Sequence, residues 1–287
     1  MSKERLRASA YAKINEFLTV TGVREERALH ARMHTLRTVM QTVSLCDTVE
    51  VEKADTLTFT CSEPSLAGKD NLCVKAATAF FAVLETRLAA GLTESASIRL
   101  EKKIPTGAGL GGGSADAAAV LRLLNRLYGD PLPEETLFSL GEKLGADVPF
   151  CLYGGRCFCS GIGEVLDPVP DQKWRALVVA KGQGSLSTAE MYRRLDARGV
   201  GLGGPNAFEP VAIELLPEIG ELKRALKALG GRKARMTGSG SALFAFFPSM
   251  RKAEIAAEAL RRERNCFAVA CRTVSHEEVT RNFRSGD

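Results

Sequence analysis

A glycine-rich stretch from Pro105 to Ser114 runs directly into the alanine-rich segment 115–119, and it constrains the fold more than any other part of the chain. Glycine allows a positive φ and lets a ligand approach the backbone closely. The alanine-rich segment predicts a helix, whose first turn presents unpaired N–H groups and the positive end of the helix dipole. Together they predict a phosphate-binding loop, because a merely flexible loop is not normally followed at once by strong helix formers.

Two common phosphate-binding motifs do not account for this loop. A Walker A motif requires a lysine immediately before its serine or threonine, but Gly113 precedes Ser114. Gly107, Gly109 and Gly112 match the Rossmann spacing G-x-G-x-x-G. That fold also needs an acidic residue after the following strand, whereas Asp130 stands in a Gly-Asp-Pro turn. A dinucleotide-binding Rossmann domain is therefore disfavoured.

Composition limits the class of protein and its partners. The chain has 287 residues, enough for two domains, and its 39 Lys and Arg against 34 Asp and Glu give a net charge of +5. No basic stripe interleaved with aromatic residues is present, so a nucleic acid is not expected as the main partner. No apolar run reaches membrane-spanning length, and no signal-peptide core follows the first residues. We therefore expect a cytoplasmic protein that acts on a small molecule.

The eight cysteines fit that location. Most of them lie in apolar segments such as 148–152 and 267–271, and no C-x-x-C pair occurs. The pattern predicts buried free thiols in a reducing compartment rather than disulfides or a zinc site.

Hydrophobic periodicity predicts an α+β protein with two domains, which we place at residues 1–160 and 161–287. For the first domain it predicts strands at 8–20, 47–53, 56–60 and 97–102, and helices at 71–88, 114–127, 134–144 and just after 145. For the second it predicts a strand at 175–180, a helix at 188–195, a loop at 199–205, helices up to 229, a strand hairpin at 234–247 turning at 238–240, a helix at 251–262 and a strand at 266–274. The order of the second half is β-α-α-β-β-α-β.

Three segments in this order resemble the GHMP kinase superfamily, which includes galactokinase and homoserine and mevalonate kinases. They are Ala12-Lys13-Ile14-Asn15, the glycine loop, and Thr237-Gly238-Ser239-Gly240-Ser241-Ala242. The resemblance implies the two-domain GHMP kinase fold, with an N-terminal domain of the ribosomal protein S5 domain 2 type and a ferredoxin-like C-terminal domain. It also implies that the glycine loop holds ATP, and that the segment at 237–242 packs beside it.

A finer resemblance indicates the acceptor. The segments 34–36, 145–150 and 161–164 are similar to those of superfamily members that transfer the γ-phosphate of ATP to the 2-hydroxyl of a cytidine-diphosphate-linked methylerythritol, in the non-mevalonate isoprenoid route. ATP chemistry of this kind implies Mg²⁺. Two alternatives stay open: another GHMP small-molecule kinase, of the homoserine or mevalonate type, and a non-catalytic nucleotide-binding protein of the same fold.

The resemblance assigns the catalytic pair. It implies that Asp147 is the base that accepts the hydroxyl proton and that Lys13 lies beside it. Spacing alone favours another role for Asp147, the N-cap of a helix that carries Pro149 in its first turn. By the same reasoning Lys13 would be a solvated lysine on a strand.

The resemblance also implies the binding residues. The adenine would lie near Asn71, Leu72 and Lys102. The ATP phosphates would contact Pro105, Gly107, Ala108, Gly109, Leu110, Gly111, Gly112, Gly113 and Ser114. Ser114 is the one candidate ligand for Mg²⁺.

On the acceptor side, Asn15 and Thr188 would lie near the diphosphate and erythritol. His34 would hydrogen-bond the cytosine, and Tyr192 would stack on it. From the residues alone, Tyr192 fits a helix core position equally well, and His34 fits a partly buried histidine with a backbone partner.

One departure from the family pattern concerns the base pocket. The family usually carries Asp-Gly-Tyr-His at this point, but here the loop at 24–34 is longer and Met33 replaces the tyrosine. Methionine can still cover a ring face through its sulfur. We nevertheless expect weaker discrimination among nucleotides. His30 and His34 have the i, i+4 spacing of a helical metal site, but no third ligand accompanies them.

Overall fold

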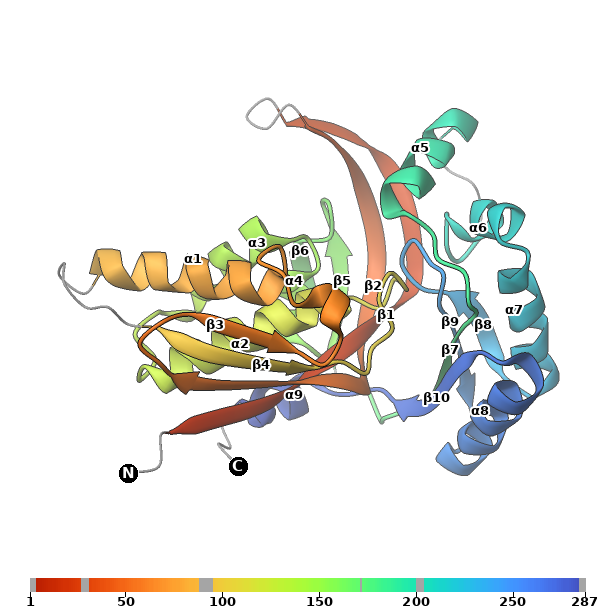
Figure 1. Ribbon diagram of the computed structural model, residues 1–287. Coiled ribbons are helices and arrows are strands. Elements are labelled where there is room, and N and C mark those ends of the chain that lie inside the picture. Colours follow the sequence, from red (N-terminus) through yellow and green to blue (C-terminus); the bar gives the residue numbers. More distant parts are fainter. Residues whose placement is uncertain (1–3, 27–30, 88–94, 171, 200–203, 284–287) are drawn as a thin grey trace.

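The structure is a computed structural model that describes residues 4–26, 31–87, 95–170, 172–199 and 204–283. Two sheets lie at opposite ends of the molecule, and a long ribbon of two antiparallel strands joins them (Figure 1). The mixture of helices and strands expected for an α+β protein is confirmed. None of the described helices combines the length and the apolar character needed to cross a bilayer.

The first sheet has the strand order β3-β4-β2-β5-β6, with β1 paired to β2. Its strands are β1 Arg5–Glu26, β2 Ala31–Lys53, β3 Thr58–Cys61, β4 Ala96–Glu101, β5 Arg156–Ser160 and β6 Val165–Pro168. Only β3 and β4 run parallel among the described pairs. The strict alternation at 47–53 correctly predicts the part of β2 whose one face is buried, since Val49 and Val51 are almost fully enclosed.

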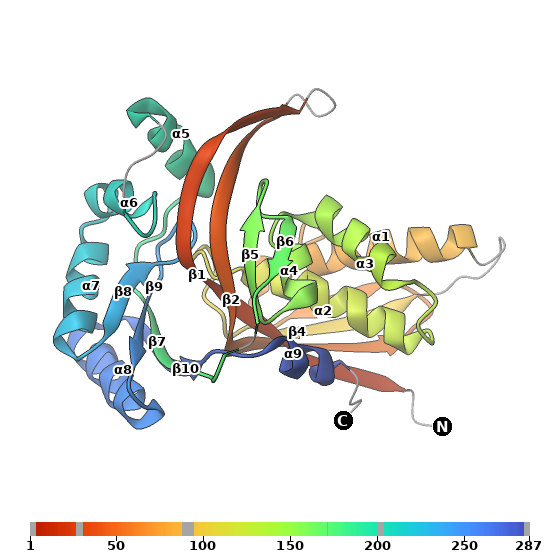
Figure 2. The same ribbon diagram turned by 180° about the vertical axis from the view of Figure 1, so that it is seen from behind.

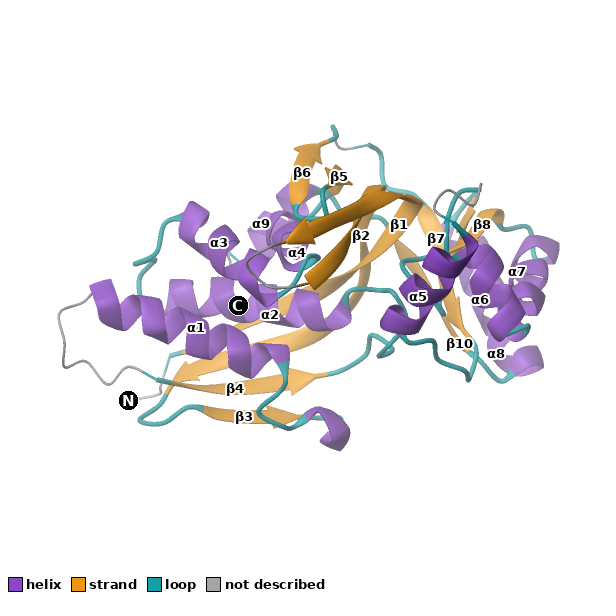
Figure 3. Cartoon of the chain, turned by 90° about the horizontal axis from the view of Figure 1, so that it is seen from above, coloured by secondary structure: helices purple, strands orange, loops and turns teal. Residues whose placement is uncertain are grey.

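Four described helices and one short 3₁₀ turn belong to this domain; the second helix lies on the sheet, and the other three pack against that helix (Figure 3). They are η1 Pro64–Leu66, α1 Leu72–Arg87, α2 Gly112–Leu127, α3 Glu134–Leu144 and α4 Val148–Tyr153. The alanines at 115 and 117–119 are buried, and these small side chains let α2 lie close to β1 and β2. The helix that starts the phosphate site is thus held rigidly by the core.

The second sheet has the antiparallel order β10-β7-β9-β8. Its elements are β7 Ala176–Lys181, α5 Thr188–Arg198, α6 Glu209–Leu215, α7 Glu218–Ala228, β8 Arg232–Met236, β9 Leu243–Phe247, α8 Met250–Arg264 and β10 Phe267–Arg272. This is the ferredoxin-like β-α-β-β-α-β arrangement, with three helices in the first connection. The last helix, α9 His276–Asn282, returns to the first domain and contacts β1 and α4 (Figure 2).

The ribbon of β1 and β2 belongs to both hydrophobic cores. Its first-domain part supplies Leu6 and Val49, whereas Leu18 and Leu36 pack in the second core with Phe208. The ladder changes register at three places, between residues 11 and 13, 15 and 17, and 20 and 22. Register shifts of this kind bend a strand and re-aim its side chains.

The structure corrects the interpretation of 24–34 as a long loop. Arg24 pairs with Met33 and Glu26 with Ala31, so this segment continues the two strands, apart from residues 27–30, which lie outside the described residues. His34 therefore lies on a strand, so its i, i+4 spacing from His30 does not place the two side chains on one face of a helix. His30 itself lies outside the described residues. Hydrophobic periodicity predicts neither the first half of β2 nor β5, β6 or α9.

The other element predictions agree with the structure to within a few residues. The hairpin at 234–247 forms β8 and β9, and α2 begins two residues before the predicted Ser114. The last residue of the helix predicted at 71–88 and the middle of the loop predicted at 199–205, residues 200–203, lie outside the described residues. The domain boundary at 160/161 stays a prediction. β6 pairs with β5 of the first sheet, and the second sheet begins at β7.

Candidate active site

The glycine loop adopts a backbone that only glycine takes readily. Gly107, Gly109 and Gly111 have φ values of 60°, 75° and 68°. A Cβ atom at Gly111 would lie 2.9 Å from Cγ of Lys13, and one at Gly109 would collide with the carbonyl oxygen of Thr237. The loop is therefore pressed between β1 and the segment that follows β8.

That second segment, residues 237–242, packs beside the loop as the resemblance implies. The Ala242 amide donates to the Ala108 carbonyl at 3.1 Å, and a Cβ at Gly238 would lie 2.8 Å from the Gly109 carbonyl oxygen. The Lys13 amide donates to the Leu110 carbonyl at 2.9 Å. The side chains of Ala108 and Leu110 are buried, so these two residues can serve a ligand only through their backbone.

The loop ends at the N-terminus of α2. Gly111 is the N-cap residue, and its lack of a side chain leaves the amides of the first turn uncovered from that side. Free amides and the dipole of a 16-residue helix favour an anion at this point. Ser114 stands in the first turn and lines the adjoining cavity.

Lys13 and Asp147 form an ion pair at the edge of this loop. Nζ of Lys13 lies 3.1 Å from Oδ2 of Asp147, and the two side chains are 5% and 30% exposed. Asp147 occupies the N-cap position of α4, with Pro149 in the first turn, but in the described part of the chain its carboxylate makes no capping hydrogen bond. Asp147 thus stands at the predicted N-cap position, but its carboxylate pairs with Lys13.

Asn15 connects this pair to the second domain. Its Oδ1 accepts from Nζ of Lys13 at 2.9 Å and from the Gly238 amide at 3.0 Å. Its Nδ2 donates to Oγ1 of Thr38 at 2.8 Å, and its backbone amide donates to Oγ1 of Thr237 at 2.9 Å. The amide side chain of Asn15 thus ties the lysine to β2 and to the segment beside the loop.

A cavity of about 460 Å³ gathers the predicted catalytic and acceptor residues. Its lining includes Lys13, Asn15, Met33, His34, Asp147, Thr188 and Tyr192, together with Gly109, Gly111 and Ser114 of the loop. These come from β1, β2, α5 and the loops before α2 and α4, so both domains contribute. A larger cavity of about 830 Å³, walled mainly by α2, α3 and α9, contains none of the predicted site residues.

His34 and Tyr192 form one end of the 460 Å³ cavity. Their rings stack with centroids 4.4 Å apart, and Nε2 of His34 lies 2.7 Å from Oδ1 of Asp196. Tyr192 also packs edge-on against Phe208 at 4.9 Å. Burial, and to a lesser degree the charge of Asp147, raises the pKa of Tyr192 to about 12, so its hydroxyl stays protonated. This end of the cavity is therefore lined by two aromatic rings, and its tyrosine is uncharged.

Beneath the loop lies a second lysine with two aspartates. Nζ of Lys102 is paired with Asp47 and, at 2.7 Å, with Oδ2 of Asp116, and the three side chains are at most 9% exposed. Burial lowers the pKa of Lys102, but the two carboxylates raise it more, so it lies above its ordinary value. Burial, aided by the charge of Asp47, raises the pKa of Asp116 to about 8 against the opposing effect of Lys102. Oδ1 of Asp116 is buried with no hydrogen-bond partner among the described residues.

The residues predicted near adenine lie together on this side of the loop. A Cβ at Gly112 would be 3.3 Å from Nζ of Lys102, and one at Gly113 would be 3.6 Å from Cδ1 of Leu72. Asn71 immediately precedes α1: its Oδ1 accepts from the Cys73 amide and its Nδ2 donates to the Leu66 carbonyl, both at 2.9 Å. The position of the adenine beside Gly112 and Gly113 stays a prediction.

Sequence reasoning missed several partners of the predicted residues, namely Thr38, Asp47, Asp116, Asp196 and Ser239. Asp116 carried a usable signal, because a single charge among buried alanines requires a buried partner. The others are separated from their partners by long stretches of chain. For example, Oγ of Ser239 lies 2.8 Å from Oγ1 of Thr188.

Comparison with known proteins identifies relatives of this chain. Residues 71–155 match the family model described as GHMP kinases N terminal domain, and residues 189–265 match the one described as GHMP kinases C terminal. A Desulfitobacterium hafniense protein named 4-diphosphocytidyl-2-C-methyl-D-erythritol kinase is 38% identical over 287 residues, covering 92% of this chain and 94% of that relative.

Two solved structures share the fold. A crystal structure of 4-(cytidine 5'-diphospho)-2C-methyl-D-erythritol kinase superposes with a TM-score of 0.77 at 34% identity, covering 93% of this chain and 98% of that one. The structure of L. major mevalonate kinase in complex with R-mevalonate gives 0.68 at 17% identity, covering 96% and 98%, a likeness of fold alone.

Proposed function

The chain belongs to the GHMP kinase family, and on that premise we propose that it transfers the γ-phosphate of ATP to the 2-hydroxyl of 4-diphosphocytidyl-2-C-methyl-D-erythritol. One observation carries the proposal. The Lys13–Asp147 pair, the glycine loop and the stacked His34 and Tyr192 line a single cavity. A phosphate site, a proton acceptor and an aromatic base platform are thereby within reach of one substrate.

Asp147 is the proposed base. Its carboxylate takes the proton from the acceptor hydroxyl as the oxygen forms a bond to the γ-phosphorus, and the bond from that phosphorus to the bridging oxygen breaks, releasing ADP with the electron pair. Lys13, held by Asn15 at 2.9 Å, orients the carboxylate and offsets the negative charge of the transferred phosphoryl group. The amides at the start of α2 hold the phosphates of ATP through the loop backbone.

Magnesium fits the site as a companion of ATP. The structure shows no group of three metal-binding side chains among its described residues, so the phosphates would supply most ligands and the Ser114 hydroxyl one more. When bound, the ion neutralises phosphate charge. Pro105 to Gly113 would line the remaining ATP phosphates, with Asn71, Leu72 and Lys102 at the adenine.

The acceptor lies along the rest of the cavity. Asn15 and Thr188 stand near its diphosphate and erythritol, and Met33, His34 and Tyr192 surround the cytosine. The relatives at 38% and 34% identity that carry this substrate in their names support it over homoserine or mevalonate. The intact Lys13–Asp147 pair argues against a non-catalytic nucleotide-binding protein.

The cytoplasm is the proposed location. The structure describes all eight cysteines, and each is a free thiol. Burial raises the pKa of Cys73, Cys151 and Cys271 above the ordinary thiol value, which keeps them unreactive. Free thiols of this kind suit a reducing compartment.

ATP consumption by the purified protein tests the proposal. With Mg²⁺ present, 4-diphosphocytidyl-2-C-methyl-D-erythritol should stimulate ADP release strongly, and homoserine or mevalonate should not. If only another alcohol stimulated ADP release, the protein would still be a kinase, but its acceptor would be that alcohol. ATP binding without turnover on any alcohol would favour the non-catalytic alternative.

A further inference from the structure

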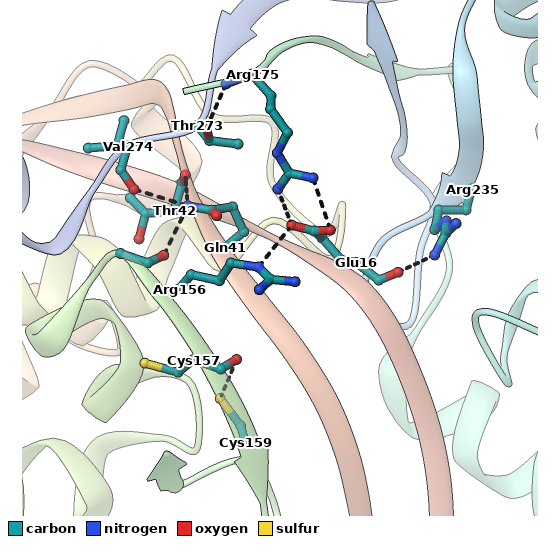
Figure 4. Close-up of polar contacts among 11 residues, drawn as sticks. Glu16, Gln41, Thr42, Arg156, Cys157, Cys159, Arg175, Arg235, Thr273 and Val274 are labelled. Atoms are coloured by element: carbon teal, nitrogen blue, oxygen red, sulfur yellow. Dashed lines mark hydrogen bonds and ion pairs between the residues drawn. The ribbon is translucent and has the colours of Figure 1, made fainter. Parts of the chain in front are cut away.

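A cluster of one carboxylate and three guanidinium groups lies at the junction of the two domains, outside the proposed catalytic machinery (Figure 4). Glu16 of β1 accepts from Nε of Arg156 at 3.4 Å and from Nη1 of Arg175 at 3.3 Å, and Nη2 of Arg175 makes a further short contact with it. The backbone carbonyl of Glu16 accepts from Arg235. We call these four residues the junction cluster.

The cluster joins elements of both sheets. Glu16 and Arg156 belong to strands of the first sheet, Arg175 immediately precedes β7, and Arg235 lies on β8. The Glu16 side chain is 12% exposed, and those of Arg156 and Arg175 are 18% and 27% exposed. Interactions so shielded from solvent hold geometry better than surface ion pairs do.

Arg175 is itself held in place from several sides. Its backbone amide donates to Oγ1 of Thr273 at 3.0 Å, and its guanidinium carbon lies 4.2 Å above the ring of Phe246. Its Nε is buried without a partner among the described residues. An arginine whose Nε is left unpaired indicates that its position is dictated by the pair with Glu16 and the stack on Phe246.

Glu16 occupies a special place on its strand. Asn15 pairs with Met40 and Phe17 with Val39, so Glu16 is the extra residue at a register shift. Its chain neighbour Asn15 is the residue that binds both Lys13 and the Gly238 amide. A displacement of the backbone at Glu16 would therefore move the link between Lys13 and the segment beside the glycine loop.

We propose that Glu16 is a positioning residue: by binding Arg175 across the domain junction, it sets the backbone from which Asn15 holds Lys13 and Gly238 together. The inference rests on the proposed kinase function for its effect on turnover. Without the Glu16 carboxylate, the guanidinium groups of Arg156 and Arg175 would lie close together with no opposing charge between them, and the junction would open.

The carboxylate is ionised throughout the working range. Burial raises the pKa of Glu16, but the hydrogen bonds and charges of Arg175 and Arg156 lower it more, so it lies below its ordinary value. Loss of the cluster should consequently lower turnover by a similar factor at every pH near neutrality. That behaviour separates a positioning residue from an acid or base in the reaction.

The first experiment compares Glu16→Gln with Glu52→Gln in steady-state kinetics. Glu52 pairs with Arg5 at 3.2 Å on the same two strands but far from the cavity, and is the matched control. Misplaced catalytic groups lower kcat more than binding, so we expect Glu16→Gln to lower kcat about tenfold or more with the KM for ATP within about twofold. Glu52→Gln should match the wild type.

Two further variants identify the partner that matters. Arg175→Gln should reproduce the loss, and the double variant Glu16→Gln/Arg175→Gln should add little to it, because both remove one interaction. Arg156→Gln, which breaks a contact within the first sheet only, should have a smaller effect. Glu16→Asp keeps the charge and should restore part of kcat, which also serves if Glu16→Gln folds poorly.

Hydrogen exchange provides a measurement that does not depend on turnover. The Gly238 amide donates to Asn15, so in Glu16→Gln it should exchange about tenfold faster, with no change in Glu52→Gln. If the wild type phosphorylates no acceptor, the proposed function fails while this measurement still tests Glu16. Unchanged exchange at Gly238, or a kcat of Glu16→Gln within twofold of the wild type, would overturn the proposal.

Discussion

Two lysine–aspartate groups flank the glycine loop and differ in what surrounds them. Lys13 and Asp147 face the cavity, and the aspartate is 30% exposed. Lys102 is enclosed with Asp47 and Asp116, whose side chains are at most 3% exposed. The first group can exchange a proton with a ligand, whereas the second is enclosed and does not line the cavity. Access to the cavity separates the proposed catalytic pair from the enclosed group, although both use the same residue types.

The largest effect is expected when the pair of Lys13 and Asp147, which faces the cavity, is broken. Asp147→Asn removes the proton acceptor while keeping the shape of the side chain, so kcat should fall by about 10²- to 10⁴-fold. ATP binding should persist, because the loop amides are untouched. Steady-state kinetics and an ATP-binding titration measure both quantities.

Asp130→Asn is the control for this prediction, since that aspartate lies on the surface in a pair with Arg126. Its turnover should equal that of the wild type. If Asp147→Asn kept full turnover, the assignment of the base would be wrong.

A change in the enclosed group of Lys102, Asp47 and Asp116 should lower the stability of the fold. Lys102→Met would leave Asp47 and Asp116 buried without a counter-charge, and the free energy of unfolding should fall by about 3–5 kcal/mol. Urea denaturation of the variant measures the loss. Lys75→Met, which breaks an exposed pair with Asp70, should change it by less than about 1 kcal/mol. Equal losses in both variants would contradict the comparison.

Asp116 gives the enclosed group a pH signature. Its pKa is about 8 in the folded chain and near 3.8 when unfolded, so over that window the folded chain holds a proton that the unfolded chain has released. Stability from this group is therefore greatest below pH 4 and decreases as pH rises towards 8. Asp116→Asn should flatten that decrease.

Chemical denaturation at several pH values checks this prediction. The comparison is between the slopes of the variant, the wild type and Asp130→Asn, whose exposed carboxylate should leave the wild-type slope intact. Parallel curves for Asp116→Asn and the wild type would show that Asp116 is not the group responsible.

The smallest effect concerns the far end of the open cavity. Met33→Tyr would add an aromatic face near His34, and ring stacking of about 0.5–1.5 kcal/mol should lower the KM for the cytidyl substrate about two- to tenfold. The KM for ATP should not move. An unchanged KM for the cytidyl substrate would mean that Met33 already covers the base as well as a tyrosine does.

Local signals predicted much of the fold, and the failures have physical causes. The alternation at 47–53 and the glycine loop are properties of neighbouring residues, so the sequence shows them directly. Burial along β2 changes from even-numbered residues, such as Leu36 and Met40, to odd-numbered ones, such as Val43 and Val49. The strand therefore follows no single alternating face, and its first half was not predicted.

The site divides in the same way. Asp147 could be placed from the helix start that follows it, but its contact with Lys13 joins residues far apart in the chain. The partners of Glu16 and Lys102 likewise come from distant strands. Contacts between residues so far apart in the chain arise only from the tertiary fold. A resemblance to known proteins can identify Lys13 and Asp147, but it does not show how far each side chain is buried.

The shared ribbon has a consequence for synthesis on the ribosome. Leu18, Val20 and Leu36 emerge early, yet the second-core residues that cover them, such as Phe208 and Val211, are translated much later. At about 5–20 residues per second the wait is ~10–40 s. During that time half of an otherwise finished ribbon presents bare apolar side chains. The nascent chain should accordingly bind a holdase chaperone at this segment, and release it only when the second sheet closes.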